Sequence, residues 1–181
     1  LAGGLLGLVT RTAGSVSMEG SVAYVTQTPQ ILNESIRENI LFGSEMDKAW
    51  YNRVLDSCAL RQDIKQFDSG DATQIGERGI TVSGGQKQRF AIAATLVNDP
   101  EIVFLDEPTA GLDPLARRNL WDFVRSVNLR GHTVVLTTHS MEEAEFLCSR
   151  VAIMDRGRIV AMDTPRDLVR ALPVPYEVRV G

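Results

Sequence analysis

The chain has 181 residues, of which 44% are hydrophobic and 23% are charged, a balance typical of a single soluble globular domain. Its net charge of −4 and isoelectric point near 5.2 argue against a nucleic-acid-binding protein that works through a basic face. Two cysteines, Cys58 and Cys148, fit no metal-binding spacing, so we expect small buried side chains in a reducing, intracellular compartment.

The first apolar run, Leu1–Val9, reaches about half of the ~20 residues that a membrane span needs. We therefore expect a core helix there rather than a span or a signal peptide. Alternation bounded by glycines over Gly14–Gly20 predicts a short strand and a turn. The apolar run Ser21–Val25 then predicts a buried strand that leads to Gln27.

Two helices are expected next, over Asn33–Leu41 and Asp47–Leu60. In the second, apolar residues recur at helical spacing, and Asp47 stands where a capping side chain is needed. A polar, glycine-bearing loop follows over Asp68–Thr81, and a further helix is expected from Ser83 through Val97.

Strands and helices alternate in the rest of the chain. Ile102–Leu105 is a short apolar run typical of a buried parallel strand, and Pro114 opens an amphipathic helix. The later expected elements are a strand over Thr133–Thr138, a short acidic helix, strands over Val151–Met154 and Ile159–Ala161, and a helix from Thr164. This alternation predicts an α/β fold with a mostly parallel sheet and helices on both faces.

An acidic pair, Asp106 and Glu107, directly follows the strand expected at Ile102–Leu105. Carboxylates at the carboxyl end of a buried parallel strand lie where α/β sheets bind ligands. Asp106 is therefore a candidate ligand for Mg²⁺ against nucleotide phosphates, and Glu107 is a candidate general base for an attacking water. By itself, the pattern also fits a strand that ends in a solvated turn.

The segment Ser83-Gly84-Gly85-Gln86 opens a helix, with Ser83 as the expected capping residue. Two glycines at a helix start leave backbone N–H groups free to approach an anion closely. Taken singly, these residues also fit a plain loop with a helix cap, and His139 also fits a structural histidine.

Five motifs in this order resemble those of the ATP-binding domain of ABC transporters. They are a Q-loop at Tyr24–Gln27, a signature at Val82–Arg89, a Walker B strand at Ile102–Glu107, a D-loop at Ala110–Asp113 and a switch histidine, His139. Together they cover nearly the whole chain, from about Gly14 to Leu168. The resemblance implies a P-loop NTPase-like fold with an α-helical subdomain at about 28–90 and a catalytic core at 91–171.

The resemblance also implies roles for single residues. Glu107, His139 and Gln27 would be catalytic, with His139 as a phosphate sensor. Gln27 and Asp106 would hold Mg²⁺, and Asp113 would communicate across a dimer. The residues that would touch ATP held by a partner subunit are Ser83, Gly84, Gly85 and Gln86.

The cofactors and partners implied by the resemblance are those of a transport ATPase. They are ATP and Mg²⁺, a second ABC ATP-binding domain in a head-to-tail dimer, and a transmembrane domain or subunit. The expected location is the cytoplasmic face of a membrane, either peripheral or fused to a membrane protein. No nucleic-acid partner is expected from the acidic composition.

The phosphate-binding Walker A loop of the family, G-x-x-x-x-G-K-[ST], has no match in these residues, which contain no Gly-Lys pair. The three lysines, Lys48, Lys65 and Lys87, all lie elsewhere in the pattern. Leu1–Val9 resembles the helix that continues from such a loop, so we expect an N-terminally truncated domain that is inactive alone. A degenerate subunit that never had the loop is the alternative.

The two halves of the chain resemble different branches of the family. Ile31–Gly43 and Gly76–Gly79 resemble the multidrug-resistance-protein (C) branch. Leu105–Asp113 with Thr138–Ala144 is more similar to the A branch and to bacterial drug or lipid exporters.

Three functions follow from these observations. The first is an ATPase module that powers transport across a membrane. The second is a non-catalytic half-site, or interaction module, that supplies its signature face to an intact partner. The third is a non-transport ABC ATPase acting on nucleic acid or ribosomes, for which a basic surface or inserted arms would be expected and neither is evident.

Overall fold

A computed structural model describes residues 2–10, 12–76, 80–129 and 131–171. The chain falls into two compact units, one of Ala2–His139 and the other from Ser140 onward. Most of the Gly76–Gly79 segment lies outside the described residues. None of the helices in the described ranges has both the length and the apolar character needed to cross a membrane. The subdomain boundaries at about 28–90 and 91–171 remain predictions.

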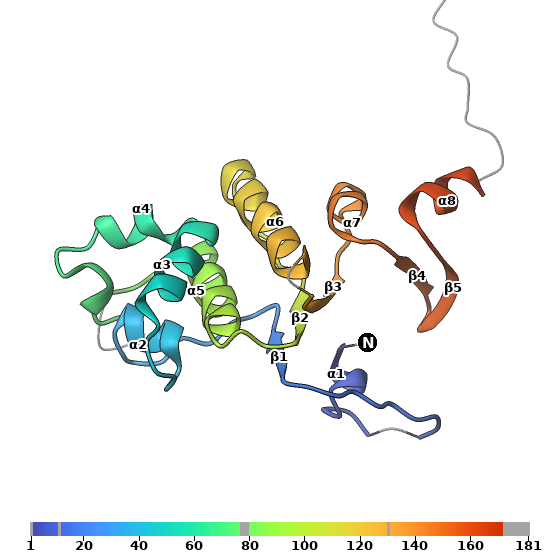
Figure 1. The fold of residues 1–181 in the computed structure, drawn as a ribbon, viewed down its shortest axis with the longest axis horizontal. Helices are drawn as coiled ribbons and strands as arrows, with labels where there is room; N and C mark the ends of the chain where they lie inside the picture. The colour runs from blue at the N-terminus through green and yellow to red at the C-terminus, as the bar shows by residue number, and fades with distance from the viewer. Residues whose placement is uncertain (1, 11, 77–79, 130, 172–181) are drawn as a thin grey trace, which may run out of the picture. The chain divides into compact units, whose positions relative to one another are not determined.

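A three-stranded parallel sheet forms the centre of the first unit (Figure 1). Its strands are β1 (Val22–Val25), β2 (Ile102–Asp106) and β3 (Thr133–Thr137), in the order β1-β2-β3. The middle strand is the most buried, as expected for a parallel strand flanked on both edges and covered by helices. In its register, Leu105 lies between Val25 and Leu136. The predicted α/β fold with a parallel sheet is confirmed.

Helices surround one long helix, α5 (Gly84–Val97), which packs against β1. The others that contact α5 are α2 (Ile36–Leu41), α3 (Lys48–Ser57) and α4 (Leu60–Lys65); a 3₁₀ turn, η1 (Gly70–Ala72), contacts α2 and α4. The apolar core of these elements includes Ile36, Ile40, Val54, Leu60, Phe90 and Ile92. The predicted helix from Ser83 through Val97 is therefore confirmed, with Ser83 as its cap.

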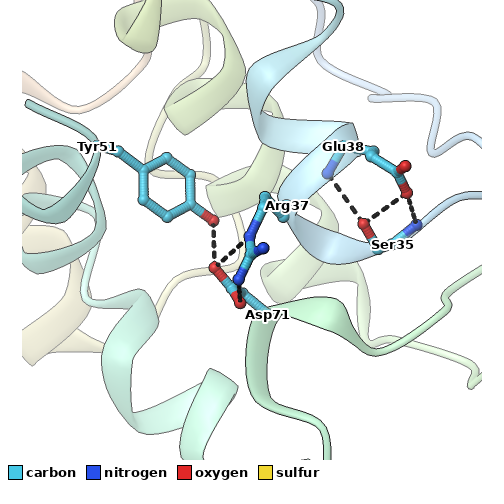
Figure 2. Close-up of polar contacts among 5 residues, drawn as sticks. All are labelled: Ser35, Arg37, Glu38, Tyr51 and Asp71. Carbon is cyan, nitrogen blue, oxygen red and sulfur yellow. Dashed lines mark hydrogen bonds and ion pairs between the residues drawn. The ribbon is translucent and has the colours of Figure 1, made fainter. Parts of the chain in front are cut away.

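Two helix boundaries differ from the predicted ones. The helix predicted at Asn33–Leu41 begins at Ile36, because Ser35 caps it in a reciprocal capping box with Glu38 (Figure 2). The helix predicted at Asp47–Leu60 is capped by Asp47 as expected, but it stops at Ser57. Ala59 adopts a left-handed backbone with φ 54°, which breaks the run and starts α4.

A polar cluster joins η1 to α2 and α3 (Figure 2). Arg37 donates two hydrogen bonds to Asp71, at 2.6 and 3.1 Å, and the Tyr51 hydroxyl donates a third at 3.0 Å. Burial raises the pKa of Tyr51, and the nearby carboxylate adds to this. Burial of Asp71 opposes its charge, but the hydrogen bonds from Arg37 and Tyr51 hold its pKa below the ordinary value.

This cluster predicts a loss of stability in acid. The pKa of Asp71 is lower in the folded chain than in the unfolded one. The Asp71 carboxylate therefore adds to the free energy of unfolding at pH values above its unfolded pKa. This stabilisation is lost as the pH falls below about 4, near the unfolded pKa, and then through the lower pKa of the folded chain. We expect Asp71→Asn to lower the free energy of unfolding at pH 7 by about 1 kcal/mol or less, since Arg37 is half exposed.

Urea unfolding at pH 7 and pH 3 measures this effect. The difference between Asp71→Asn and the unchanged chain is expected to shrink at pH 3. Asp68→Asn, at an exposed position three residues away, is the control. An equal loss of unfolding free energy in Asp71→Asn at both pH values would contradict a stabilising role for the Asp71 charge.

The beginning of the chain differs from its prediction. The helix expected at Leu1–Val9 is only α1 (Ala2–Leu5), and Leu8 and Val9 are exposed rather than in a core. Glycine at three of the first seven positions disfavours a longer helix. The strand expected at Gly14–Gly20 is absent, since within the described ranges no strand pairs with it.

The remaining elements are close to their predictions. The helix opened by Pro114 is α6 (Pro114–Leu129), which packs against β3 and α3. The second unit contains α7 (Met141–Leu147), an antiparallel hairpin of β4 (Val151–Asp155) and β5 (Arg158–Asp163), and α8 (Pro165–Arg170). Of the two cysteines, Cys58 is buried as expected and burial raises its pKa to about 12, whereas Cys148 is only half-buried.

Candidate functional site

The candidate site lies at the carboxyl edge of the parallel sheet. The carboxyl ends of parallel strands meet at one edge, which is where α/β folds bind ligands. Here Gln27 follows β1, Glu107 follows β2 and His139 follows β3, while Asp106 is the last residue of β2. Four of the predicted site residues therefore belong to one edge of the sheet.

Asp106 is held from both sides by the neighbouring strands. The register places it beside Thr137, whose hydroxyl donates a hydrogen bond to Oδ1. The Tyr24 hydroxyl from β1 reaches Oδ2 at 3.3 Å. Burial raises the pKa of Tyr24, and the charge of Asp106 raises it further, so the tyrosine stays a hydrogen-bond donor. The carboxylate is thus fixed in position across all three strands.

Glu107 and His139 lie in direct contact. His139 Nδ1 is 2.8 Å from Glu107 Oε2, although the two residues are far apart in the sequence. The Glu107 backbone N–H donates to the carbonyl and the hydroxyl of Thr137, at 3.1 and 3.2 Å. The side chain of Glu107 is 22% exposed and that of His139 is 84% exposed, so both can reach a ligand in solvent.

The backbone at Glu107 is unusual. Its φ is 49°, in the left-handed region that non-glycine residues seldom adopt. Such a conformation costs of order 1–3 kcal/mol and is enriched at active sites, ligand clamps and switch regions, where the surrounding structure enforces it. Here the two hydrogen bonds to Thr137 supply that constraint.

This arrangement has a clear chemical capacity. An ionised carboxylate accepts hydrogen bonds only, so the Glu107–His139 contact requires a proton on His139 Nδ1. That leaves His139 Nε2 and the second carboxylate oxygen of Glu107 to interact with a ligand. A carboxylate in this setting can accept a proton from a water molecule, which is the work of a general base.

The donor set at this edge also fits Mg²⁺. Mg²⁺ in nucleotide sites is held by one or two carboxylates together with water and phosphate oxygens, rather than by a cage of protein ligands. Asp106 offers one carboxylate, and the described residues contain no group of three or more His, Cys, Asp or Glu side chains that could bind a metal by themselves. Asp106 is therefore the residue that would hold the ion.

Gln27 is less closely tied to this group. It lies in an exposed bend two residues after the end of β1. Within the described ranges, no hydrogen bond joins Gln27 to Asp106 or Glu107. Its predicted contact with Mg²⁺ or the attacking water thus stays a prediction.

The loop after Glu107 leads to α6. Gly111 has φ 73°, and Asp113 then caps α6, accepting hydrogen bonds from the Leu115 and Ala116 N–H groups at 3.0 Å each. The N–H of Ala116 contributes most to lowering the pKa of Asp113. Asp113 is exposed, as a residue in contact with a second subunit would need to be, but that role stays a prediction.

The predicted signature segment forms the first turn of α5. The Ser83 hydroxyl accepts from the Gln86 N–H at 3.2 Å, and the Gln86 side chain accepts from the Ser83 N–H at 2.9 Å. Gly84 has open space around its Cα, whereas a side chain at Gly85 would lie 3.6 Å from the carbonyl oxygen of Gly111. The Gln86 side chain is engaged within the chain, so its predicted contact with nucleotide is not tested.

A cavity of about 500 Å³ opens beside the site, between β1, the loop after it, α5 and the end of α2. Its lining is mostly apolar and includes Phe90, which is buried, and Phe42, whose side chain is 67% exposed. Phe42 ends α2 with φ 47°, a strained conformation for a bulky residue.

Two residues of the site escaped the sequence analysis. The sequence places Thr137 only within the strand predicted over Thr133–Thr138, and its contact with Asp106 depends on the β2–β3 register. Asp63 binds Gln86 and Arg89, although it lies more than twenty positions earlier. No motif marks either residue, so only the folded chain reveals these contacts.

Comparisons with known proteins find related sequences along most of this chain. Residues 4–110 match the family described as ABC transporter. The chain is 43% identical over 166 residues to the ABC-type transporter cicA of Emericella nidulans, and 38% identical over 179 residues to ABC transporter C family member 9 of Arabidopsis thaliana. These alignments cover 92% and 98% of this chain, but the chain spans only 12% of the length of each relative.

Proposed function

Because the chain belongs to the ABC transporter family, with C-branch relatives along both of its halves, we propose that it is part of an ATPase module that powers transport across a membrane. The observation that carries this proposal is the Glu107–His139 contact at the sheet edge, next to a carboxylate fixed by Tyr24 and Thr137. That arrangement matches the needs of phosphoryl transfer to water, which requires positioning and charge stabilisation more than covalent chemistry.

In the proposed reaction, Glu107 accepts a proton from the attacking water. His139 orients the Glu107 carboxylate through Nδ1 and presents Nε2 toward the terminal phosphate of ATP. Tyr24 and Thr137 hold the Asp106 carboxylate in the position where it would bind Mg²⁺. When bound, Mg²⁺ neutralises phosphate charge. Gln27 would join the same ion or the attacking water from the bend after β1.

A second ATP-binding domain is the proposed partner. The 181 residues contain no Gly-Lys pair that could form the phosphate-binding loop, so we propose that they do not hydrolyse ATP by themselves. The start of α5 presents exposed Ser83 and Gly84, and it would contact ATP held by the partner in a head-to-tail dimer. Asp113, exposed at the start of α6, would communicate across that dimer.

A membrane-spanning domain or subunit is the other proposed partner, with the chain at the cytoplasmic face of the membrane. The cavity beside β1 and the exposed ring of Phe42 support this part of the proposal. Exposed aromatic side chains beside an apolar cavity are typical of interaction sites. Phe42 and part of the cavity lining, from Pro29 to Asn39, lie in the segment between Gln27 and Ser83, which in this family faces the membrane subunit.

ATP-dependent pairing tests this proposal. The chain is mixed with a separately produced C-branch ATP-binding domain that has an intact phosphate-binding loop, and the complex is measured by analytical ultracentrifugation. We expect a complex with ATP and none without it. Ser83→Arg, which places a bulky charge at the start of α5, should abolish the complex.

Ser69→Arg is the matched control, since Ser69 is exposed in the same unit but lies outside the signature. We expect it to leave pairing unchanged. Pairing that is independent of ATP, or that survives Ser83→Arg, would contradict the proposal. The non-catalytic half-site predicts the same pairing, but no change in turnover when Glu107 is substituted.

A further inference from the structure

Asp63 in α4 is the centre of a polar group that joins α4 to the start of α5. Its Oδ1 accepts a hydrogen bond from Gln86 Nε2 at 3.0 Å, and its Oδ2 accepts from Arg89 Nη2 at 2.6 Å. Asp63 is only 8% exposed, and the Arg89 side chain is 14% exposed. A buried carboxylate needs such partners, because an unpaired buried charge is costly.

The contact with Asp63 fixes the orientation of the Gln86 amide. A carboxylate only accepts, so the Gln86 group facing Asp63 must be the NH₂. The Gln86 carbonyl oxygen then faces the Ser83 N–H and accepts a hydrogen bond from it at 2.9 Å. The Ser83 hydroxyl in turn accepts from the Gln86 N–H. A continuous series of hydrogen bonds therefore runs from Asp63 through Gln86 to Ser83.

The first turn of α5 needs this support. Gly84 and Gly85 follow Ser83, and glycine in a helix costs about 1 kcal/mol relative to alanine. Neither glycine has a side chain to anchor the turn against its surroundings. The capping box of Ser83 and Gln86 holds the turn from within, and Asp63 adds support from outside it by binding two residues of α5 at once.

We propose that Asp63 is a positioning residue for the signature segment: through Gln86 and Arg89, it sets the orientation of Ser83 toward nucleotide on the partner domain. This inference rests on the proposed function, because it is the proposed contact with ATP that makes the orientation matter. Asp63 itself does not touch nucleotide. It acts through the first turn of α5.

A double-mutant cycle in the protein paired with an intact ATP-binding domain tests the inference. We expect Asp63→Ala to lower kcat for ATP held by the partner by about tenfold, comparable with Ser83→Ala. The double variant should be no slower than the worse single variant, since residues that act as a unit are non-additive. Asp63→Asn keeps an oxygen for Gln86 and should recover kcat to within about threefold of the unchanged protein.

The control is Asp56→Ala, which breaks an exposed ion pair with Arg61 on the same group of helices. It should leave kcat unchanged. Hydrogen exchange provides a second readout that does not require ATP. In Asp63→Ala the Gln86 and Lys87 amides should exchange faster than in the control, while α6 is unaffected. Asp63→Asn, which is the milder change if Asp63→Ala fails to fold, loses only the carboxylate facing Arg89 and should show a smaller increase at the same amides.

The outcomes separate this inference from the proposed function. Full turnover in Asp63→Ala, or losses that add with Ser83→Ala, would overturn the role of Asp63. If Ser83→Ala itself has no effect on turnover, the proposed function of the signature fails. The exchange measurement then still decides whether Asp63 holds the first turn of α5, and unchanged exchange would refute that as well.

Discussion

In a longer form of the protein that contains a phosphate-binding loop, Glu107→Gln is expected to lower the rate of ATP hydrolysis by about 10²- to 10⁴-fold, the usual contribution of a general base. The substitution keeps the shape of the side chain and an oxygen that accepts from His139 Nδ1. It removes the ability to take a proton from water. ATP should therefore still bind, and the paired domains should stay closed around it. Phosphate release, together with retention of labelled ATP by the complex, measures both effects.

Glu101→Gln is the control for this experiment. Glu101 is exposed and directly precedes β2, so it lies at the opposite end of the same strand from Glu107. We expect full turnover from this variant. His139→Ala should be slow as well, and combining it with Glu107→Gln should add little because the two side chains are in contact.

Unchanged hydrolysis in Glu107→Gln would remove this residue from its role. Together with ATP-dependent pairing, that result would favour the non-catalytic half-site, in which the chain only supplies its signature face. Loss of both pairing and turnover would instead indicate that the dimer itself depends on Glu107, and the general-base assignment would then be wrong.

The sequence predicts the sheet and its carboxyl edge well, because the signals there are local. The apolar run Ile102–Leu105 followed by two acids needs only a strand and its end to place Asp106 and Glu107 correctly. Ser83 and Asp47 are likewise local signals, since a capping side chain bonds to backbone within the next few residues.

Other features depend on contacts that no local pattern contains. The Glu107–His139 pair requires the β2–β3 register, and Asp63 reaches Gln86 only after α4 has packed on α5. The break at Ala59 was missed because alanine is normally the best helix former. Its left-handed backbone, with φ 54°, runs against that local preference.

The second large effect is a loss of stability, expected when a buried residue that lines the apolar cavity beside β1 is substituted. Phe90→Ala should lower the free energy of unfolding by about 3–5 kcal/mol, the usual cost of removing a buried phenylalanine. Phe90 is 1% exposed and lies where α5 packs on β1. A domain is stable by only about 5–15 kcal/mol, so this loss is a large part of the total. Urea unfolding measures it.

Phe42→Ala is the matched comparison, since both rings line the same cavity but Phe42 is 67% exposed. We expect its free energy of unfolding to change by about 0.5 kcal/mol or less, because alanine keeps the backbone of α2 and little apolar surface is lost from the core. Binding to the membrane partner should weaken by about tenfold or more, as for an aromatic anchor at an interface. If Phe42→Ala instead unfolds the chain as readily as Phe90→Ala, Phe42 belongs to the core and the proposed docking surface is wrong. Unchanged stability with unchanged partner binding would reject that surface just as firmly, because an exposed ring in a strained backbone conformation would then have no partner to account for it.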